Sequence, residues 1–349
     1  MTTQKPSVYP VGKLPQADVV KIIRKNLGKV DPRVIFGPGL GRDAAVIDFD
    51  ATYLIAKSDP ITFATDEIGW YAVNVNANDI ACMGARPRWF LATALLPEGQ
   101  TDFALVQRIA DQLHDACHAL DVALVGGHTE ITHGLHRPII VGAMLGEVAP
   151  DRLVRSDGTR PGDKLVLTKG IAVEGTAIIA QEVADRLRDA LPADTLRRAA
   201  GFLHDPGISV VRDAHIATGA GAIHAMHDPT EGGVATGIYE MVEAAGVGAD
   251  IIEADLPIYP ETRSFCEHLG LDPLGLIASG ALLAAVPPAS AEAVVAALDQ
   301  AGIAATIIGT ARAAPGVTLH GIDGGTRPLP RFDRDEIARL FEAPPHETR

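Results

Sequence analysis

The chain has 349 residues, of which 47 % are hydrophobic and 21 % charged, and its formal net charge is −14 at pH 7. This length favours two domains over one small core, and the composition excludes an intrinsically disordered or collagen-like chain. The negative charge disfavours nucleic acid and anionic membranes as partners, so we expect neither. A phosphate ligand would need metal ions or backbone N–H groups to bind it.

The three cysteines, Cys82, Cys117 and Cys266, lie far apart and form no CxxC pair. This spacing argues against a zinc site or a disulfide framework, and a sparse, odd count fits a reducing cytoplasm. The N-terminal segment MTTQKPSVYPVGKLP lacks the apolar core of a secretion signal. The longest apolar run, over residues 274–286, is too short to span a bilayer. We therefore expect a cytoplasmic protein.

The first half of the chain predicts alternating strands and helices. The segment 66–83 predicts a helix, because its apolar residues and Asp79 recur at helical spacing, and Gly84 and Pro87 end it. The other expected elements are a helix over 14–27, a Gly/Pro loop over 33–41, strands over 44–49 and 52–56, a strand over 89–95, an amphipathic helix over 103–120, a strand over 122–125, a turn at Gly126-Gly127 and a strand over 139–147.

The stretch APDRLVRSDGTRPGDK, residues 149–164, is polar and rich in turn residues, and it predicts a domain junction. We expect an N-terminal domain over residues 1–152 and a C-terminal α/β domain over 160–345. The second half predicts strands over 165–168 and 223–226, helices over 172–187, 233–245 and 289–301, and a disordered tail over 342–349. Alternating strands and helices in both halves favour an α/β or α+β fold.

Five short segments place an acidic or polar residue beside glycine or at the end of a strand, and their notable carboxylates are Asp43, Asp59, Asp79 and Asp228. Magnesium prefers oxygen ligands, usually one or two carboxylates with phosphate and water. Neighbouring glycines let backbone N–H groups approach phosphates. The carboxylates could therefore gather around the metal ions of a nucleotide. The segments are GRDAAV, KSDP, NANDIACMGA, GGHTE and HDPTEGG.

Each segment also has a simpler interpretation. Asp43 and Asp59 could be turn residues, and the segment 228–233 could cap the helix that follows it. The polar residues of NANDI could form a solvated helix face, although Asp79 shares a stripe with apolar residues. The chain carries neither a Walker A loop nor a GxGxxG motif at its expected place. The order and combination of the segments therefore carry the prediction.

Three histidines, His128, His133 and His136, lie within nine residues of one another. A loop with solvated histidines is favoured over a transition-metal site, because no cysteine or HExxH motif accompanies them. Cysteine catalysis has little support, since Cys82 lies in an apolar helical run, where cysteine behaves as a small hydrophobic residue.

The order of these motifs resembles the ATP-binding superfamily of aminoimidazole ribonucleotide (AIR) synthetase, formylglycinamidine synthetase, selenophosphate synthetase, thiamine-monophosphate kinase and the hydrogenase maturation dehydratase. The similarity runs over about residues 30 to 330. DEIGWYAVNVNANDIACMGARP is similar to the kinase, whereas HDPTEGGVATGIYEM and KGIAVEGTAII are more similar to the hydrogenase maturation branch.

The resemblance implies a two-domain α/β architecture in which the N-terminal domains pair into a β-barrel across a homodimer. It implies that ATP and Mg²⁺ are the cofactors, with ATP bound between the domains and along the dimer interface, and that the Asn-Asp helix start faces the metal-bound phosphates. The implied metal and nucleotide ligands are Asp43, Asp59, Asp79 and Asp228, and the implied further nucleotide contacts are Asn76, Asn78, Gly126 and Gly127.

The resemblance also implies an ATP-dependent enzyme that phosphorylates or activates an amide or carbonyl oxygen of a small-molecule or protein-bound acceptor. Lys57 is the candidate phosphate contact, and His128 and Glu130 are candidates for substrate contact or proton transfer. Catalysis would come from alignment and charge neutralisation rather than from a covalent nucleophile. The alternatives are a small-molecule kinase of the thiamine-monophosphate kinase type and a nucleotide-binding scaffold without turnover.

The sequence departs from the family pattern at several positions. Arg42 stands where the kinases carry the first acid of an Asp-Asp pair, and His128 stands where relatives carry a Gly-Gly-Asp aspartate. Imidazole is a poor ligand for a hard cation, so one metal position could be lost or rebuilt. Selenophosphate synthetases carry a reactive cysteine or selenocysteine near the N-terminus, and no cysteine precedes Cys82 here. The maturation dehydratase ends in a cysteine that carries the reacting group, whereas this sequence ends in PPHETR. We therefore expect that it does not perform that step in its known form.

Overall fold

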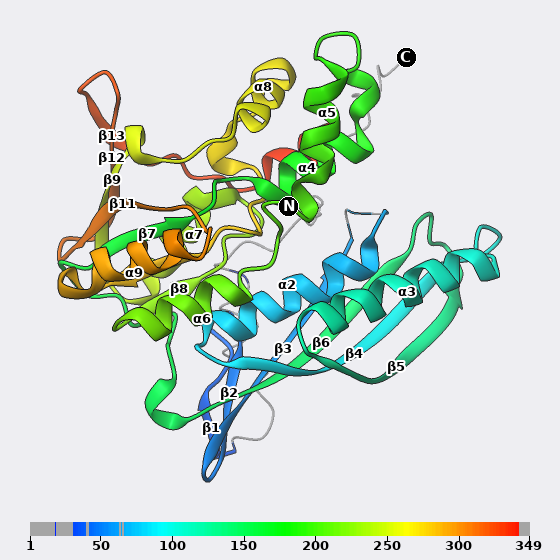
Figure 1. The fold of residues 1–349 in the computed structure, drawn as a ribbon, viewed down its shortest axis with the longest axis horizontal. Helices are drawn as coiled ribbons and strands as arrows, with labels where there is room; N and C mark the ends of the chain where they lie inside the picture. Colours follow the sequence, from blue (N-terminus) through cyan, green and yellow to red (C-terminus); the bar gives the residue numbers. More distant parts are fainter. Residues whose placement is uncertain (1–17, 19–30, 40–41, 63, 65, 342–349) are drawn as a thin grey trace, which may run out of the picture.

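The computed structural model describes residues 18, 31–39, 42–62, 64 and 66–341, and it has two α/β halves, each built on one β-sheet (Figure 1). Apart from Asp18, the helix expected over residues 14–27 lies outside the described residues, as does the tail over 342–349. None of the helices in the described ranges is long and apolar enough to cross a membrane.

In the described ranges, the N-terminal half is one sheet with two helices, α2 and α3. Its strands follow the order β1-β2-β3-β6-β4-β5. Neighbouring strands are antiparallel, except β4 and β5, which are parallel because helix α3 makes the crossover between them. The elements are β1 (Val34–Phe36), β2 (Ala45–Phe49), β3 (Thr52–Ile61), α2 (Ile68–Cys82), β4 (Arg86–Pro97), α3 (Phe103–Ala119), β5 (Ala123–Thr132) and β6 (Ile139–Val148).

Helices α2 and α3 cover one face of this sheet (Figure 1). The sequence of strand β6 explains why the helices cover one face only. Its residues alternate between buried positions, such as Ile140, Met144 and Val148, and half-buried positions on the other face. At the far edge of the sheet β5 is exposed along nearly its whole length. The described residues therefore leave the opposite face and the β5 edge of the N-terminal sheet open.

The C-terminal half has a seven-stranded sheet in the order β13-β12-β9-β11-β7-β10-β8. Helices α6 and α9 pack on one face of it through Val166 and Ala284, and α7 packs on the other through Leu165 and Leu283. Its strands are β7 (Lys164–Thr168), β8 (Ala225–His227), β9 (Gly248–Ile252), β10 (Leu283–Val286), β11 (Ala305–Arg312), β12 (Gly316–His320) and β13 (Thr326–Pro328). Its helices are α4 (Val173–Glu182), α5 (Ala193–Ala200), α6 (Val211–Ala220), α7 (Gly233–Ala244), α8 (Pro260–Leu269) and α9 (Pro288–Gln300).

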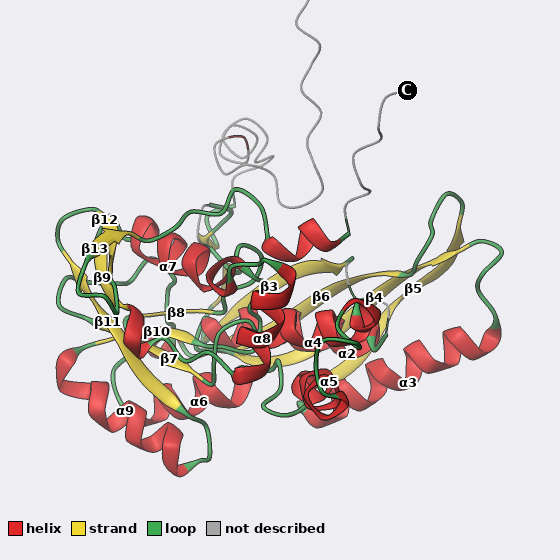
Figure 2. Cartoon of the chain, turned by 90° about the horizontal axis from the view of Figure 1, so that it is seen from above, coloured by secondary structure: helices red, strands yellow, loops and turns green. Residues whose placement is uncertain are grey.

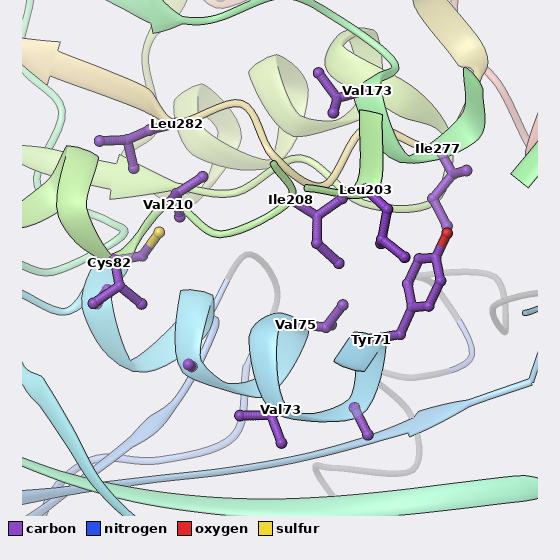
Figure 3. Close-up of a cluster of buried hydrophobic side chains, with 14 of the residues drawn as sticks. Tyr71, Val73, Val75, Cys82, Val173, Leu203, Ile208, Val210, Ile277 and Leu282 are labelled. Atoms are coloured by element: carbon purple, nitrogen blue, oxygen red, sulfur yellow. The ribbon is translucent and has the colours of Figure 1, made fainter. Parts of the chain in front are cut away.

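Seen from above, α3 and the long strands β4 and β5 lie at one end of the molecule and the edge strands β12 and β13 at the other (Figure 2). The two halves meet along α2. Figure 3 shows Tyr71 and Val75 of α2 facing Leu203, Ile208 and Val210 of the C-terminal half. Helix α2 thus packs on its own sheet with one side and on the second half with another, which explains why nearly all its residues are buried.

The predicted mixed α/β fold class is confirmed, and most expected elements are present within a few residues of their expected ends. The barrel across a dimer and the domain boundaries at residues 152 and 160 stay predictions. Some local predictions were wrong. The expected loop over 33–41 contains the short strand β1, and the expected helix over 172–187 ends at Glu182 and is followed by a separate 3₁₀ turn over Ala184–Arg186.

The strand expected to end at residue 56 runs on through Asp59 to Ile61, because β6 pairs with it over this whole length. Asp59 is therefore a strand residue and not a turn residue. The expected turn at Gly126-Gly127 is also wrong, because both glycines lie inside β5. Gly127 has a φ of 150°, and a Cβ there would lie 1.9 Å from the carbonyl oxygen of Ala92. That glycine is needed for the close approach of β4 and β5 rather than for a turn.

Candidate functional site

The four predicted carboxylates come together where the two halves meet. Asp43 precedes β2, Asp59 lies in β3, Asp79 lies in α2, and Asp228 directly follows β8. We call these four residues the carboxylate cluster. The Nζ atom of Lys57 lies 3.2 Å from Asp59 Oδ2 and 3.1 Å from Asp79 Oδ2, so one ammonium group bridges β3 and α2.

His227 joins the cluster from the C-terminal half. Its Nδ1 lies 2.8 Å from Asp43 Oδ1, and its Nε2 lies 3.1 Å from Glu240 Oε2 on α7. His227 and Asp43 are both buried. Sequence reasoning selected Asp228 but missed its neighbour His227 and the partner Glu240. The signal was present in the HDPTEGG segment, where the histidine immediately precedes the selected aspartate.

Both cations of the site are held in their charged form. Burial alone would lower the pKa of Lys57, but the carboxylates of Asp79 and Asp59 outweigh it and raise that pKa above its usual range. Burial likewise opposes the charge on His227, and Asp43 and Glu240 outweigh it, so the pKa of His227 is well above its usual range. The site therefore contains a lysine ammonium and an imidazolium at neutral pH.

The carboxylates outnumber these two cations. Burial raises the pKa of Asp228 to about 7, with a further contribution from Asp43. Burial also raises the pKa of Asp79 well above its usual range, against the opposing charge of Lys57. Burial therefore favours the protonated form of these two carboxyls, and a divalent cation would compete with protons for the same oxygens.

The oxygens of the cluster fit a hard divalent cation. Asp43 Oδ2 and Asp228 Oδ2 are buried without a hydrogen-bond partner among the described residues, and such atoms ordinarily have one. In the described part of the chain no three His, Cys, Asp or Glu side chains form a ready-made metal site. Lys57 explains this, because its ammonium lies between Asp59 and Asp79, where a cation would otherwise bind.

The asparagines of the NANDI segment make contacts within the protein. Asn76 Oδ1 accepts a hydrogen bond from the backbone N–H of Asp59 (2.9 Å), so it fixes β3 beside the cluster. Gly142 makes room for this amide, because a Cβ there would lie 2.4 Å from Asn76 Nδ2. The expectation of an Asn-Asp helix start was wrong, since these residues lie in the last two turns of α2.

Asn78 joins the two halves. Its Nδ2 donates to the carbonyl oxygen of Ile208 (2.8 Å), and its Oδ1 accepts from the N–H of Val210 (2.8 Å). These bonds, the bond of Asn76 and the Lys57–Asp79 contact explain why the buried helix α2 carries polar residues. Each amide already has protein partners in this structure. The nucleotide contacts expected of Asn76 and Asn78 stay predictions.

The remaining predicted residues lie on β5, away from the carboxylate cluster. His128 is in register with Thr93 of β4, Thr93 with Val141 of β6, and Val141 with Pro60 of β3. Three strand spacings of about 4.8 Å separate His128 from the strand that carries Asp59. Glu130 accompanies His128, with His128 Nε2 3.6 Å from Glu130 Oε2, and both side chains are exposed. Gly126 and Gly127 lie on the same strand, so one chain does not bring these four residues to the cluster.

Arg42, for which the resemblance implies an acid in the kinases, contacts Phe36 and Gly37. Its guanidinium lies over the ring of Phe36, 4.2 Å from the ring centroid, and its Nη1 donates to the carbonyl oxygen of Gly37 (2.9 Å). The guanidinium of Arg42 is therefore held by these two contacts, and no ion pair between it and a cluster carboxylate is present among the described residues.

A two-domain α/β chain whose halves meet at buried carboxylates and a lysine has the architecture of the ATP-dependent synthetase class of enzymes. The family models agree with this class. The model of the AIR synthase related protein N-terminal domain matches residues 41–148, and that of the C-terminal domain matches residues 160–322. The chain belongs to the AIR synthase related family, in the branch of the hydrogenase maturation protein carbamoyl dehydratase HypE. The predicted family and the predicted class of enzyme are thereby confirmed.

The relatives and structural neighbours of this chain are similar over most of their length. Carbamoyl dehydratase HypE of Rhizobium leguminosarum bv. viciae is 35 % identical over 281 residues, which are 77 % of this chain and 76 % of the relative. The crystal structure of hydrogenase maturation protein HypE in complex with ATP is 27 % identical, with a TM-score of 0.72 over 91 % of this chain and 96 % of that one. The structure of AaThiL with AMPPCP and TMP is 20 % identical, with a TM-score of 0.70 over 91 % and 96 %, and it shows a shared fold.

Proposed function

We propose that this chain is an enzyme that binds Mg-ATP at the carboxylate cluster and uses it to phosphorylate or activate an amide or carbonyl oxygen. The observation that carries the proposal is the pair of buried, unpartnered oxygens Asp43 Oδ2 and Asp228 Oδ2, one from each half, beside the Lys57 bridge. The ATP complex of a 27 % identical HypE structure supports the choice of nucleotide.

Asp43, Asp59, Asp79 and Asp228 are the residues that would hold magnesium, and the bound ion would neutralise charge on the transferring phosphoryl group. Lys57 has two states in this proposal. Without nucleotide its ammonium bridges Asp59 and Asp79. With the carboxylates engaged elsewhere, the same ammonium is released to contact the phosphates. The imidazolium of His227 keeps Asp43 in place between the two halves.

We infer that the acceptor presents an amide or carbonyl oxygen, on a small molecule or on a protein. The support is the name of the relatives, which are carbamoyl dehydratases of hydrogenase maturation. Cys82, whose Sγ lies 3.9 Å from Asp228 Oδ1, is buried, and burial raises the pKa of its thiol well above the usual range. Cys82 is therefore an unreactive thiol, which supports a reaction driven by alignment and charge rather than by a covalent nucleophile.

We further propose a homodimer that pairs the N-terminal sheets. Strand β5 is a long exposed edge strand, and Leu124, Val125 and Ile131 on it are each about half exposed. Such an edge is ordinarily covered, because its unpaired backbone and apolar side chains favour association. In a dimer, His128 and Glu130 of one protomer could contact the acceptor in the site of the other.

The proposal is tested by titration calorimetry of ATP with and without Mg²⁺. We expect binding that requires the metal, and we expect Asp79→Asn to weaken it by a factor on the order of 10 or more, as for loss of a charged ligand. Asp115→Asn, an exposed carboxylate on α3, is the matched control and should bind as the parent does. Unchanged affinity in a folded Asp79→Asn variant would falsify the assignment. A panel of carboxamides and carboxylates then identifies the acceptor by ATP turnover.

A nucleotide-binding scaffold without turnover is the second candidate. The Lys57 bridge favours it, because the ammonium already occupies the place of a cation between Asp59 and Asp79. ATP binding without turnover on any acceptor of the panel would favour this candidate. A small-molecule kinase of the thiamine-monophosphate kinase type shares the fold, and phosphate transfer to a phosphomonoester added to the panel would identify it.

A further inference from the structure

A second feature lies between the two halves, apart from the carboxylate cluster. It is a cavity of about 660 Å³, which is within the usual size range of small-molecule sites. Its walls come from the start of α2, the start of β4, the end of α3 and the segment 203–216 of the C-terminal half. None of the four aspartates of the cluster, nor Lys57 or His227, lines it.

The lysine and arginine residues of this cavity outnumber its carboxylates, although the chain as a whole carries a net charge of −14. The cations are Arg86, Arg88, Lys169 and Arg212, and the carboxylates are Asp121 and Asp213. Lys169 and Asp213 neutralise each other, with Lys169 Nζ 3.4 Å from Asp213 Oδ1 and 2.6 Å from the carbonyl oxygen of Ser209. The hydroxyl of Thr168 also donates to Asp213 (2.7 Å). The charges and hydrogen-bonding groups of these residues are paired with one another, so we do not assign them to a ligand.

Two guanidinium groups of the lining have donors to spare. Within the described residues Arg86 makes no hydrogen bond or ion pair, and Arg212 uses only Nη2, which donates to the carbonyl oxygen of Ala301 (2.8 Å). The third, Arg88, is paired with Glu147 through Nε at 2.9 Å. Arg86, Arg212 and His215 all line the cavity, and Arg212 precedes His215 by about one turn of α6.

The rest of the lining is apolar and aromatic. Trp70 lies at one side, with its ring centroid 4.7 Å from that of His204, and Leu203, Ile208 and Ile303 add aliphatic surface. A guanidinium binds carboxylate and phosphate oxygens in a planar, directional way. An apolar wall with a few directed polar groups is the usual composition of a site for an organic ligand.

We propose that this cavity binds a small organic anion, with its phosphate or carboxylate group on Arg86 and Arg212 and its apolar or aromatic body against Trp70. The site is separate from the nucleotide site, since no cluster residue lines it. Phosphate and carboxylate share this chemistry, and the experiment separates them.

The test uses a built-in reporter. The chain has two tryptophans, Trp70 and Trp89, and Trp89 is on β4 outside the cavity lining. In Trp89→Phe the tryptophan fluorescence comes from Trp70 alone. This protein is titrated at constant ionic strength, in excess Mg-ATP, with phenyl phosphate, phenylacetate and the neutral analogue benzyl alcohol. We expect a saturable change with at least one anion, and binding of benzyl alcohol weaker by a factor on the order of 10 or more.

Arg212→Gln and Arg86→Gln in the same background should each weaken anion binding by a factor on the order of 10. Arg327→Gln is the control, because Arg327 is an exposed arginine that pairs with Glu253 outside the cavity. Absence of saturation with both anions overturns the proposal. So does unchanged affinity in both cavity variants, or an equal loss in Arg327→Gln. The readout needs no turnover, so failure here is distinct from failure of the proposed reaction.

Discussion

The imidazole of His227 lies 2.8 Å from the carboxylate of Asp43, and this contact joins the C-terminal half to the N-terminal half at the carboxylate cluster. Both side chains are buried, and the other ring nitrogen of His227 faces Glu240. Removing one partner of a buried ion pair leaves the other charge uncompensated, which costs more than the pair itself contributes. The stability of the protein should therefore depend strongly on His227.

We expect His227→Ala to lower the free energy of unfolding by about 3–5 kcal/mol, measured by urea denaturation at pH 7. His320→Ala is the matched control, because His320 also lies near an aspartate, Asp250, but both side chains are exposed. That variant should change stability by less than about 1 kcal/mol. Equal effects of the two substitutions would contradict the role of His227 as the link between the halves.

The sign of the pH dependence follows from the raised pKa of His227. A histidine whose folded pKa lies above its unfolded value stabilises the fold fully below the unfolded value, which is about 6.5. Its contribution is lost as the pH rises through the folded pKa. The difference in stability between the parent and His227→Ala should therefore be largest at pH 6 and shrink in alkaline solution.

Asn78 gives a second prediction about the contact between the halves. Asn78→Ala would leave the carbonyl of Ile208 and the N–H of Val210 without their partner in a buried place. Each unpaired group costs about 1–3 kcal/mol, so we expect a total loss of about 2–6 kcal/mol in unfolding free energy. Asn74→Ala is the control, because Asn74 is also buried in α2 but donates only to the Trp70 carbonyl within the same helix. A smaller loss in Asn78→Ala than in Asn74→Ala would contradict this account.

The carboxylate cluster could be predicted from the sequence because each aspartate lies in a motif that local rules and family resemblance both select. The partners of those aspartates could not be predicted in the same way. Asn78 bonds to residues 130 and 132 positions further along the chain, and His227 reaches Asp43 across 184 positions. Such pairings depend on how two sheets dock, and no local pattern of residues encodes that geometry.

At Gly126-Gly127 the local sequence predicted a turn, and the structure has a strand. A pair of glycines is typical of a turn. Its neighbours His128 and Glu130 are residue types that are typical of catalytic sites. The structure uses Gly127 for the close approach of β5 to β4, because β5 follows a helical crossover and pairs in parallel with β4. Parallel pairing between distant segments overrides the local turn preference. The edge position of β5, which separates His128 from the cluster, follows from strand order and not from composition.

A buried glutamate gives a third prediction, on pH dependence. Glu174 lies in the first turn of α4, and burial raises its pKa to about 8, with Glu231 and Asp335 adding to the rise and Ser279 opposing it. The folded state then keeps a proton that the unfolded state has lost between about pH 4.5 and pH 8. Folding stability from this group therefore falls as the pH rises through that window.

Glu174→Gln should remove this dependence. We expect the unfolding free energy of the parent to fall by up to about 1.4 kcal/mol per pH unit from this group, and the slope of the variant to be shallower by that amount. Urea denaturation at pH 5.5, 7 and 8.5 measures it. Asp185→Asn, an exposed carboxylate paired with Arg188, is the control and should keep the parental slope. An unchanged slope in Glu174→Gln would mean that this carboxyl does not hold the proton.

The last prediction concerns His128, for which the family resemblance implies an aspartate in relatives, and which lies three strands from the cluster in its own chain. An imidazole ring can act as a general base in its neutral form and as a general acid in its protonated form. We expect His128→Ala to leave Mg-ATP binding nearly unchanged and to lower turnover on the identified acceptor by a factor on the order of 10². We expect His128→Asp not to restore turnover, because an ionised carboxylate cannot donate a proton. Tighter metal binding and higher activity in His128→Asp would instead identify a weakened metal site.

A mixing experiment decides whether His128 acts across the proposed dimer. Each site would use Asp79 of one protomer and His128 of the other. A mixed dimer of Asp79→Asn and His128→Ala then has one intact site and one doubly impaired site. Random exchange of equal amounts of the two inactive variants should restore about a quarter of the parental turnover, since half of the dimers are mixed and each has one working site of two. If His128 served Asp79 of its own chain, every site in the mixture would lack one residue, and no activity would return.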